Sequence, residues 1–238
     1  MAIYRRFLDG VPWYLARHYW WAYLWDKSIW FFDHQPIINA ILFGNYRKLQ
    51  AITLPHITSD PTHSVLQLTC VYGELTGKLL KRLPQGMTIV DACTAQLELA
   101  KRKTADGTHP LHCIRLNAES LSFADNSFDQ IVVFFLFHEM PHDARMRCIA
   151  EIARTLRPGG SLILTEYAPL PENHLLYRFP LTRWIISRLE PFLPDFWRHD
   201  IRAALENTLQ TQGKTLSSAN HMDCFRHFYR VTCFRLED

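Results

Sequence analysis

The sequence predicts an α/β protein whose doubly wound, mostly parallel sheet carries helices on both faces. Two observations lead to this prediction. Short apolar segments that resemble buried strands alternate with helical segments along most of the chain. The length of 238 residues suits one such domain with an extension, and a content of 48% hydrophobic against 21% charged residues allows a buried core.

The predicted elements begin after residue 60 and follow one another in a regular order. Strands are expected at 64–70, 87–91, 111–115, 128–135, 161–166, 215–218 and 228–236, and helices at 73–83, 94–103 and 142–156. Thr94 is expected to cap the second helix, and Pro158-Gly159-Gly160 is expected to end the third. Open sheets of this kind bind ligands at the carboxyl ends of their strands, so the candidate site is expected there.

Two segments outside this alternation are expected to cover the site. Residues 1–60 form a predicted N-terminal helical extension or lid, residues 61–238 the α/β domain, and residues 170–211 a helical insertion before the last two strands. Aromatic side chains crowd residues 13–46, whose spacing predicts one or two amphipathic helices. Their rings could pack the lid, line a pocket for a flat apolar ligand, or form a belt at a membrane surface.

Composition narrows the range of partners. A net charge of +3 argues against a dedicated nucleic-acid binder. The six cysteines form no C-x-x-C pair, which predicts free thiols in a reducing compartment rather than disulfides or a zinc cage.

Met1–Asp9 lacks the apolar segment of a signal peptide, and the chain lacks a run of about 18 apolar residues that would span a bilayer. Residues 177–188 suit a helix at a membrane surface or an ordinary amphipathic helix.

Three residues near the ends of the first two strands could contact a ligand. Asp91 ends the strand at 87–91, where a carboxylate offers paired acceptors to the two hydroxyl groups of a ribose; the alternative is a helix cap. Gly73 allows the chain to turn closely against a ligand. Its bulky neighbour Tyr72 could stack on a ligand ring or simply pack.

A set of imidazole and carboxylate groups is predicted at the mouth of the site. His138 and Glu139 follow the strand at 128–135, and Glu74 faces the same mouth from the first loop. They could act as base, orienting group or metal ligands, and a divalent ion such as Mn²⁺ suits such ligands. A buried structural histidine is the alternative. Further candidates are Glu166, Tyr167, His199 and Asp200.

Residues 65–74 read V-L-Q-L-T-C-V-Y-G-E, where class I S-adenosylmethionine (AdoMet) methyltransferases carry an acid and a glycine-rich turn. Gln67 stands at the acid position, and of the glycines only Gly73 remains. Residues 117–129, N-A-E-S-L-S-F-A-D-N-S-F-D, resemble the methyltransferase stretch whose first polar residue contacts the adenine. The resemblance implies a Rossmann-like class I AdoMet-dependent methyltransferase fold. The predicted cofactor-binding residues are Gln67, Cys70, Tyr72, Gly73, Asp91, Ala92, Gln96, Asn117, Ala118, Glu119 and Phe134.

Five longer segments carry a more specific resemblance: P-W-Y-L-A-R-H-Y-W-W-A-Y-L, I-L-F-G-N-Y, T-C-V-Y-G-E-L-T, V-V-F-F-L-F-H-E-M and L-E-P-F-L-P-D-F-W-R-H-D-I. In them the chain resembles the rhodoquinone-biosynthesis methyltransferase-like proteins, relatives of the ubiquinone and menaquinone methyltransferases. The resemblance implies that an amino group replaces a ring methoxy group of ubiquinone, with AdoMet as amino donor and a manganese ion assisting.

The same resemblance implies a lipid quinone as partner, and a cytoplasmic protein bound peripherally to the inner membrane. On this basis the predicted catalytic residues are His138, Glu139, Glu74 and Tyr72. The predicted metal ligands are Glu74, His138 and Glu139.

The altered turn is consistent with amino transfer. An acid at position 67 could hold the amine of the cofactor as ammonium, whereas an amine must be deprotonated to attack a ring carbon. Gln67 removes that negative charge. Two other functions stay open. A conventional quinone methyltransferase would explain Asp91 and the loop at 117–123, and a non-catalytic scaffold would explain the lost glycines.

Overall fold

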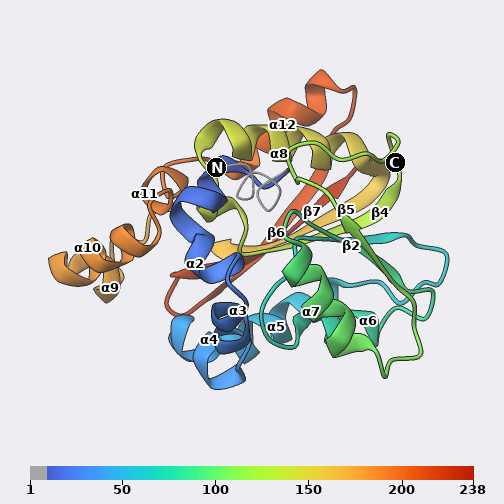
Figure 1. The fold of residues 1–238 in the computed structure, drawn as a ribbon. Coiled ribbons are helices and arrows are strands. Elements are labelled where there is room, and N and C mark those ends of the chain that lie inside the picture. The colour runs from blue at the N-terminus through green and yellow to red at the C-terminus, as the bar shows by residue number, and fades with distance from the viewer. Residues whose placement is uncertain (1–9) are drawn as a thin grey trace.

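A seven-stranded sheet forms the centre of the computed structural model, which describes residues 10–238 (Figure 1). Five strands pair in parallel and a hairpin of the last two adds an antiparallel edge, which confirms the predicted α/β class. Residues 1–9, where the sequence predicts that a signal peptide is absent, lie outside the described residues. The strands are β1 (Val65–Leu68), β2 (Met87–Asp91), β3 (Leu111–Arg115), β4 (Phe128–Phe134), β5 (Leu156–Tyr167), β6 (Leu216–Cys224) and β7 (Tyr229–Leu236).

The strand order β3-β2-β1-β4-β5-β7-β6 reverses its direction at β1. From β1 the chain winds outward through β2 to β3, and it then returns to the other side of β1 as β4. The crevice outside the carboxyl ends of β1 and β4 is where open α/β sheets bind ligands. All four residues of β1 are buried, as expected of a central strand that is covered on both faces.

Helices cover both faces of the sheet (Figure 1). The helices α5 (Tyr46–Thr53), α6 (Leu75–Leu80) and α7 (Thr94–Thr104) lie on one face, and α8 (His142–Thr155) and α12 (Ile201–Thr211) lie side by side on the other. Although α12 falls within the predicted insertion of residues 170–211, its packing on α8 makes it part of the helical layer. The rest of the insertion forms α9 (Leu175–Arg178), α10 (Pro180–Leu189) and α11 (Leu193–Phe196).

Two local predictions are wrong. Thr94 is the first residue of α7 rather than its cap, because Cys93 holds the capping position. The backbone N–H of Cys93 donates instead to Oδ1 of Asp91 at 2.7 Å. Pro158-Gly159-Gly160 does not separate a helix from a later strand, since α8 passes directly into β5 and these residues form an irregularity at the start of that strand.

The N-terminal extension folds into a series of short helices rather than the one or two that the sequence predicts. Extended backbone at Trp25 and His34 separates them, and Pro36 stands in the first turn of the next helix. Among residues 10–238, no helix has both the length and the apolar character that crossing a membrane requires. The helices of the extension within the described residues are the π-helix η1 (Leu15–Tyr19), α2 (Trp20–Tyr23), α3 (Asp26–Phe32), α4 (Gln35–Ile41), α5 and the 3₁₀-helix η2 (Leu54–His56).

Candidate active site

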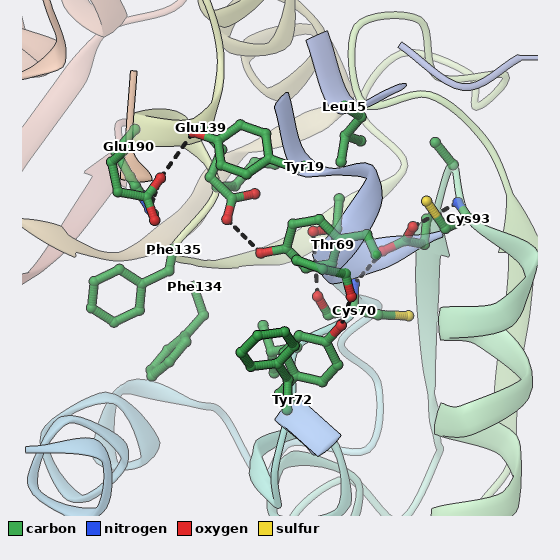
Figure 2. Close-up of a pocket in the computed structure, with 18 of the residues that line it drawn as sticks. Leu15, Tyr19, Thr69, Cys70, Tyr72, Cys93, Phe134, Phe135, Glu139 and Glu190 are labelled. Atoms are coloured by element: carbon green, nitrogen blue, oxygen red, sulfur yellow. Dashed lines mark hydrogen bonds and ion pairs between the residues drawn. The ribbon is translucent and has the colours of Figure 1, made fainter. Parts of the chain in front are cut away.

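A pocket lies between the carboxyl ends of the strands and the N-terminal extension (Figure 2). Its cavity volume is about 170 Å³. We call the strand-end residues Cys70, Asp91 and Asn117 its floor, and we call Tyr14, Tyr19 and Tyr23 of the N-terminal extension its roof. The residues from the predicted set that line the pocket are Cys70, Tyr72, Asp91, Ala92, Asn117, Ala118, Phe134, His138 and Glu139.

Asp91, at the end of β2, is buried in the floor. Its Oδ2 accepts a hydrogen bond from the backbone N–H of Cys70 at 3.0 Å, and its Oδ1 accepts one from Cys93 at 2.7 Å. Burial raises the pKa of Asp91 to about 6, although both hydrogen bonds act to lower it. Each carboxylate oxygen keeps a further lone pair, so this group can accept two ribose hydroxyl groups.

The loop after β3 presents Asn117 and Ala118 to the same pocket. The side chain of Asn117 is held by its own loop, because its Oδ1 accepts the N–H of Glu119 at 3.0 Å. Glu119 is not among the residues that line the pocket. Its Oε1 accepts a hydrogen bond from the hydroxyl of Tyr14 at 3.1 Å, and its Oε2 lies 2.6 Å from Nη2 of Arg147. Through these two contacts, Glu119 holds the roof residue Tyr14 in place.

Gln67 in β1 and Gly73 in the altered turn that follows both lie behind the pocket surface. Gln67 is fully buried, its Nε2 donates to the carbonyl oxygen of Thr69 at 2.9 Å, and its Oε1 has no hydrogen-bond partner among the described residues. Gly73 has a φ of +80°, and a Cβ at this position would lie 2.4 Å from the hydroxyl of Tyr46. Its N–H donates to Oδ1 of Asp33 at 2.8 Å, so the N-terminal extension binds the turn directly.

Tyr72 reaches from this turn into the pocket and meets the roof. Its ring stacks on that of Tyr23, with 5.8 Å between the ring centroids and 10° between the planes. Its hydroxyl donates to the carbonyl oxygen of Ala22 and accepts a hydrogen bond from Nε2 of Gln96 at 2.9 Å. Burial raises the pKa of Tyr72, so the phenol stays protonated at neutral pH. Gln96 thus supports Tyr72 and does not line the pocket itself.

His138 lies after β4 in the short helix η3 (Phe137–Glu139) and is almost fully buried. Its Nδ1 lies 2.9 Å from Oε2 of Glu166, whose Oε1 accepts the backbone N–H of Phe137 at 2.6 Å. Glu166 therefore fixes the imidazole ring, and Nε2 lies 3.9 Å from Oε2 of Glu190. Burial acts to lower the pKa of His138, but the nearby carboxylates, Glu166 above all, raise it to about 9.

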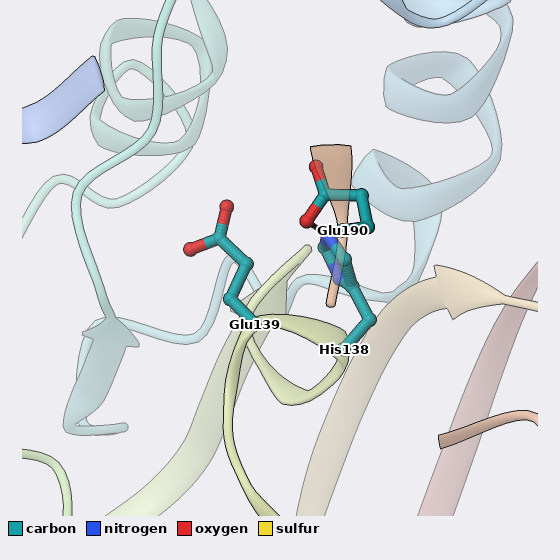
Figure 3. Close-up of side chains that lie close together, drawn as sticks. All are labelled: His138, Glu139 and Glu190. Atoms are coloured by element: carbon teal, nitrogen blue, oxygen red, sulfur yellow. Dashed lines mark ion pairs between the residues drawn. The ribbon is translucent and has the colours of Figure 1, made fainter. Parts of the chain in front are cut away.

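His138, Glu139 and Glu190 form a cluster in which one ligand atom of each residue lies within 4.8 Å of the others (Figure 3). Burial raises the pKa of Glu139 to about 8, with His138 opposing the rise and Glu190 adding to it. One imidazole and two carboxylates suit a divalent cation such as Mn²⁺. A histidine whose other ring nitrogen is held by a carboxylate is also typical of metal ligands. The residues present therefore fit the metal that the resemblance implies.

The structure does not bring Glu74 to this cluster. Its side chain is half-exposed next to α6 and pairs with Nζ of Lys78 at 2.9 Å. Glu190, which follows α10, supplies the second carboxylate instead. The sequence pattern does not predict Glu190 as a ligand, because it lies 51 positions beyond Glu139 and no spacing links the two. Two signals could have pointed to it: it belongs to the segment L-E-P-F-L-P-D-F-W-R-H-D-I that carries the specific resemblance, and it follows a run, 173–189, without an acidic residue.

The remaining candidates divide between the pocket and the helical layer. Tyr167 lines the pocket at the end of β5. His199 lies outside it, with its Nδ1 2.8 Å from Nη1 of Arg145. Asp200 caps α12, since its Oδ1 accepts the backbone N–H of Ala203 at 3.0 Å.

Residues 65–160 match the family model described as a methyltransferase domain. The chain is 30% identical over 148 residues to the ubiquinone/menaquinone biosynthesis C-methyltransferase UbiE of Bordetella avium (strain 197N), covering 60% of this chain and 57% of that protein. It is 28% identical over 171 residues to the demethylmenaquinone methyltransferase of Lactiplantibacillus plantarum (strain ATCC BAA-793 / NCIMB 8826 / WCFS1), covering 70% of each. The chain thus spans little more than half the length of the first relative.

Among solved structures, the fold resembles that of the N-methyltransferase NodS from Bradyrhizobium japonicum WM9 in complex with S-adenosyl-l-homocysteine. The TM-score is 0.54 at 19% identity, over 82% of this chain and 88% of NodS. Likeness at this identity shows the fold alone. The chain therefore has the Rossmann-like class I methyltransferase fold and is similar in sequence to methyltransferases named for ubiquinone and menaquinone biosynthesis.

Proposed function

We propose that the protein replaces a ring methoxy group of a ubiquinone-type lipid quinone by an amino group, with AdoMet as amino donor and Mn²⁺ held by His138, Glu139 and Glu190. The observation that carries the proposal is that this cluster lines the same pocket as Asp91. A cation in this pocket would polarise a quinone carbonyl and make a ring carbon electrophilic. An electrophilic ring carbon suits attack by an amine, whereas C-methylation needs a nucleophilic ring carbon, so the cluster favours amino transfer.

The proposed exchange is balanced without an oxidant. The amine nitrogen bonds to the ring carbon, and the methoxy group leaves with a proton as methanol. The bond between this nitrogen and the carbon skeleton of the donor then breaks by elimination, in which a proton from the adjacent carbon moves to the nitrogen. A bound divalent cation supplies Lewis-acid polarisation of a quinone carbonyl, which makes the ring carbon more electrophilic.

The residues of the chain orient the reactants in this proposal. Asp91 accepts the ribose hydroxyl groups and Asn117 contacts the base, as their places in the floor allow. Gln67 leaves the first turn without a carboxylate that would stabilise the amine as ammonium. The stacked rings of Tyr72 and Tyr23 offer an aromatic surface against which a flat quinone can pack. Glu74 has no part in the proposal, because it is paired with Lys78 outside the pocket.

An anionic bilayer surface is the proposed source of the quinone. The helices α9 and α10 project from the body of the molecule, and no side chain of α10 is buried (Figure 1). Phe179 and Trp184 are 65% and 64% exposed. An apolar and basic surface complements the acyl chains and anionic headgroups of a leaflet. Glu190 follows α10 and lines the pocket, so this surface adjoins the proposed cation site. The arginines of this segment are Arg178, Arg183 and Arg188.

Conventional methylation of a quinone is the second candidate, and the comparisons favour it. The relatives carry the names of C-methyltransferases of ubiquinone and menaquinone biosynthesis and of a demethylmenaquinone methyltransferase. The floor with Asp91 would serve either reaction. The cluster around His138 and the missing carboxylate at Gln67 are the features that methylation leaves without a role.

Mass spectrometry of the quinone product tests the proposal. The full chain is incubated with Mn²⁺, a short-tailed ubiquinone and AdoMet whose amino nitrogen is isotopically labelled. We expect a product that has lost one methoxy group and gained the labelled amino group. A product heavier by one methyl group would establish the second candidate. No product, together with no AdoMet binding in calorimetry, would support a non-catalytic scaffold.

A further inference from the structure

Three tyrosines of the roof each donate a hydrogen bond to a different glutamate of the domain. Tyr14 donates to Oε1 of Glu119 at 3.1 Å, across 105 positions of the chain. Tyr19 donates to Oε2 of Glu190 at 2.8 Å, across 171 positions. Tyr23 donates to Oε1 of Glu139, across 116 positions. A single short segment thus reaches glutamates that follow β3, β4 and α10. Figure 2 shows Tyr19 of this segment beside Glu190.

The local helical geometry brings the three hydroxyl groups onto one side of this segment. Residues Leu15–Tyr19 form a π-helix, in which backbone groups five positions apart are joined. Tyr14 and Tyr19 have this separation. Tyr19 ends the π-helix and Tyr23 ends the α-helix α2 that follows, and their ring centroids lie 6.2 Å apart. A uniform α-helix would rotate Tyr14 away from the other two, so the π-helical turn aligns all three with the pocket.

Two of these tyrosines touch the proposed cation site itself. Tyr19 binds one oxygen of Glu190, and Tyr23 binds one oxygen of Glu139. In each pair the phenol hydroxyl is the donor, because a carboxylate oxygen can only accept. Each glutamate keeps its second oxygen for another ligand.

His138 has an equivalent partner. Glu166 holds its Nδ1 at 2.9 Å and leaves Nε2 available. Each of the three candidate ligands is therefore oriented by one hydrogen bond from outside the cluster. Partners of this kind fix the orientation of metal ligands and are a large part of the affinity of metal sites.

We infer that Tyr19 and Tyr23 are positioning residues of the cation site, which is complete only when the N-terminal segment lies over the pocket. The inference rests on the cation site of the proposed function. Without the two hydroxyl groups, the side chains of Glu139 and Glu190 would each lose the hydrogen bond that orients them toward His138. The N-terminal segment thus performs two tasks, since it covers the pocket and holds two cation ligands in place.

The test compares the full chain with three variants, Tyr19→Phe, Tyr23→Phe and Tyr14→Phe. All keep the aromatic ring and remove only the hydroxyl group. Tyr14→Phe is the matched control, because Glu119 lies outside the cluster and is held independently by Arg147. The affinity for Mn²⁺ is measured by electron paramagnetic resonance without AdoMet or quinone, and thermal unfolding checks that each variant folds.

We expect Tyr19→Phe and Tyr23→Phe each to weaken Mn²⁺ binding by about tenfold or more, and Tyr14→Phe to change it by less than about twofold. Unchanged binding in both Tyr19→Phe and Tyr23→Phe would overturn the inference and leave the proposed function intact. Equal weakening in all three variants would also overturn it, because it would indicate a general role of the lid. A wild-type chain that binds no Mn²⁺ would refute both the inference and the cation part of the proposed function, whereas amino transfer is decided separately by the quinone product.

Discussion

The floor and the roof of the pocket are built from contacts of different range. In the floor, Asp91 holds Cys70 across 21 positions and Cys93 across two. In the roof, the bond from Tyr19 to Glu190 joins residues 171 positions apart. The floor is made by short loops at neighbouring strand ends of the sheet. The roof belongs to the N-terminal extension and binds an insertion far away in the chain, so its contacts depend on how distant segments fold together.

The largest expected effect concerns the floor. Asp91→Asn should weaken AdoMet binding by about 100-fold, because a charge-assisted hydrogen bond contributes about 1.5–3 kcal/mol and the neutral amide offers one acceptor oxygen in place of two. Isothermal calorimetry on the full chain measures the change. Asp129→Asn is the control, since Asp129 pairs with Arg157 at 2.8 Å and does not line the pocket. A change below about threefold for Asp91→Asn would contradict the ribose role.

The next effect separates Glu190, which the structure places in the cluster, from Glu74, which the sequence predicts as a ligand. Glu190→Gln should weaken Mn²⁺ binding by at least about tenfold, because it removes one of the two anionic ligands. Glu74→Gln should leave binding within about twofold, because Glu74 is exposed and paired with Lys78. Titration with Mn²⁺ under electron paramagnetic resonance measures both. If Glu74→Gln had the larger effect, the cation site would lie at the first turn and not beneath the roof.

The difference between floor and roof also explains what the sequence can predict. The alternation of apolar strands and helices predicts the parallel sheet, because each element carries its own pattern of burial. Asp91 is recognisable because it ends a strand, and His138 and Glu139 because they follow one. Each of these positions is defined by the strand next to it. Assigning the strands is therefore enough to place these residues at the edge formed by the carboxyl ends of the strands.

Glu190 and the roof tyrosines have no such local marker. Their roles arise from contacts across more than 100 positions, and the sequence contains no spacing that would pair Tyr19 with Glu190. The same limit affects Glu74, which stands beside a correctly predicted turn but points away and binds Lys78 one helical turn later. A position at a strand end fixes where the backbone of a residue lies. The direction of its side chain depends on packing against distant segments, which the sequence pattern does not reveal.

A smaller effect tests the surface next to the roof. Trp184→Ser on α10 should weaken binding to vesicles of phosphatidylglycerol and phosphatidylcholine by about fivefold to tenfold, as loss of one partly inserted apolar side chain costs about 1–1.5 kcal/mol. Met222→Ser is the control, because Met222 is also exposed but lies on the edge strand β6. Cosedimentation at low and high salt measures binding, and salt should weaken it by screening the arginines. Equal effects of the two substitutions would argue against α10 as the contact surface.

The smallest effect is a pH dependence that belongs to the floor alone. Burial raises the pKa of Asp91 from 3.8 to about 6, so folded protein without cofactor holds an extra proton between these values. Its free energy of unfolding therefore falls as pH rises through this window, and the ionised carboxylate is destabilising above it. Ribose hydroxyl groups would donate hydrogen bonds to the ionised carboxylate of Asp91 and offset the cost of its burial, so AdoMet binding should release a proton near pH 6.

The affinity for AdoMet should fall about fourfold from pH 7.5 to 5.5, as the ionised fraction of Asp91 falls, and Asp91→Asn should not show this pH dependence. Calorimetry of both proteins across this range measures it, and an identical pH profile for the two would show that Asp91 does not titrate with binding.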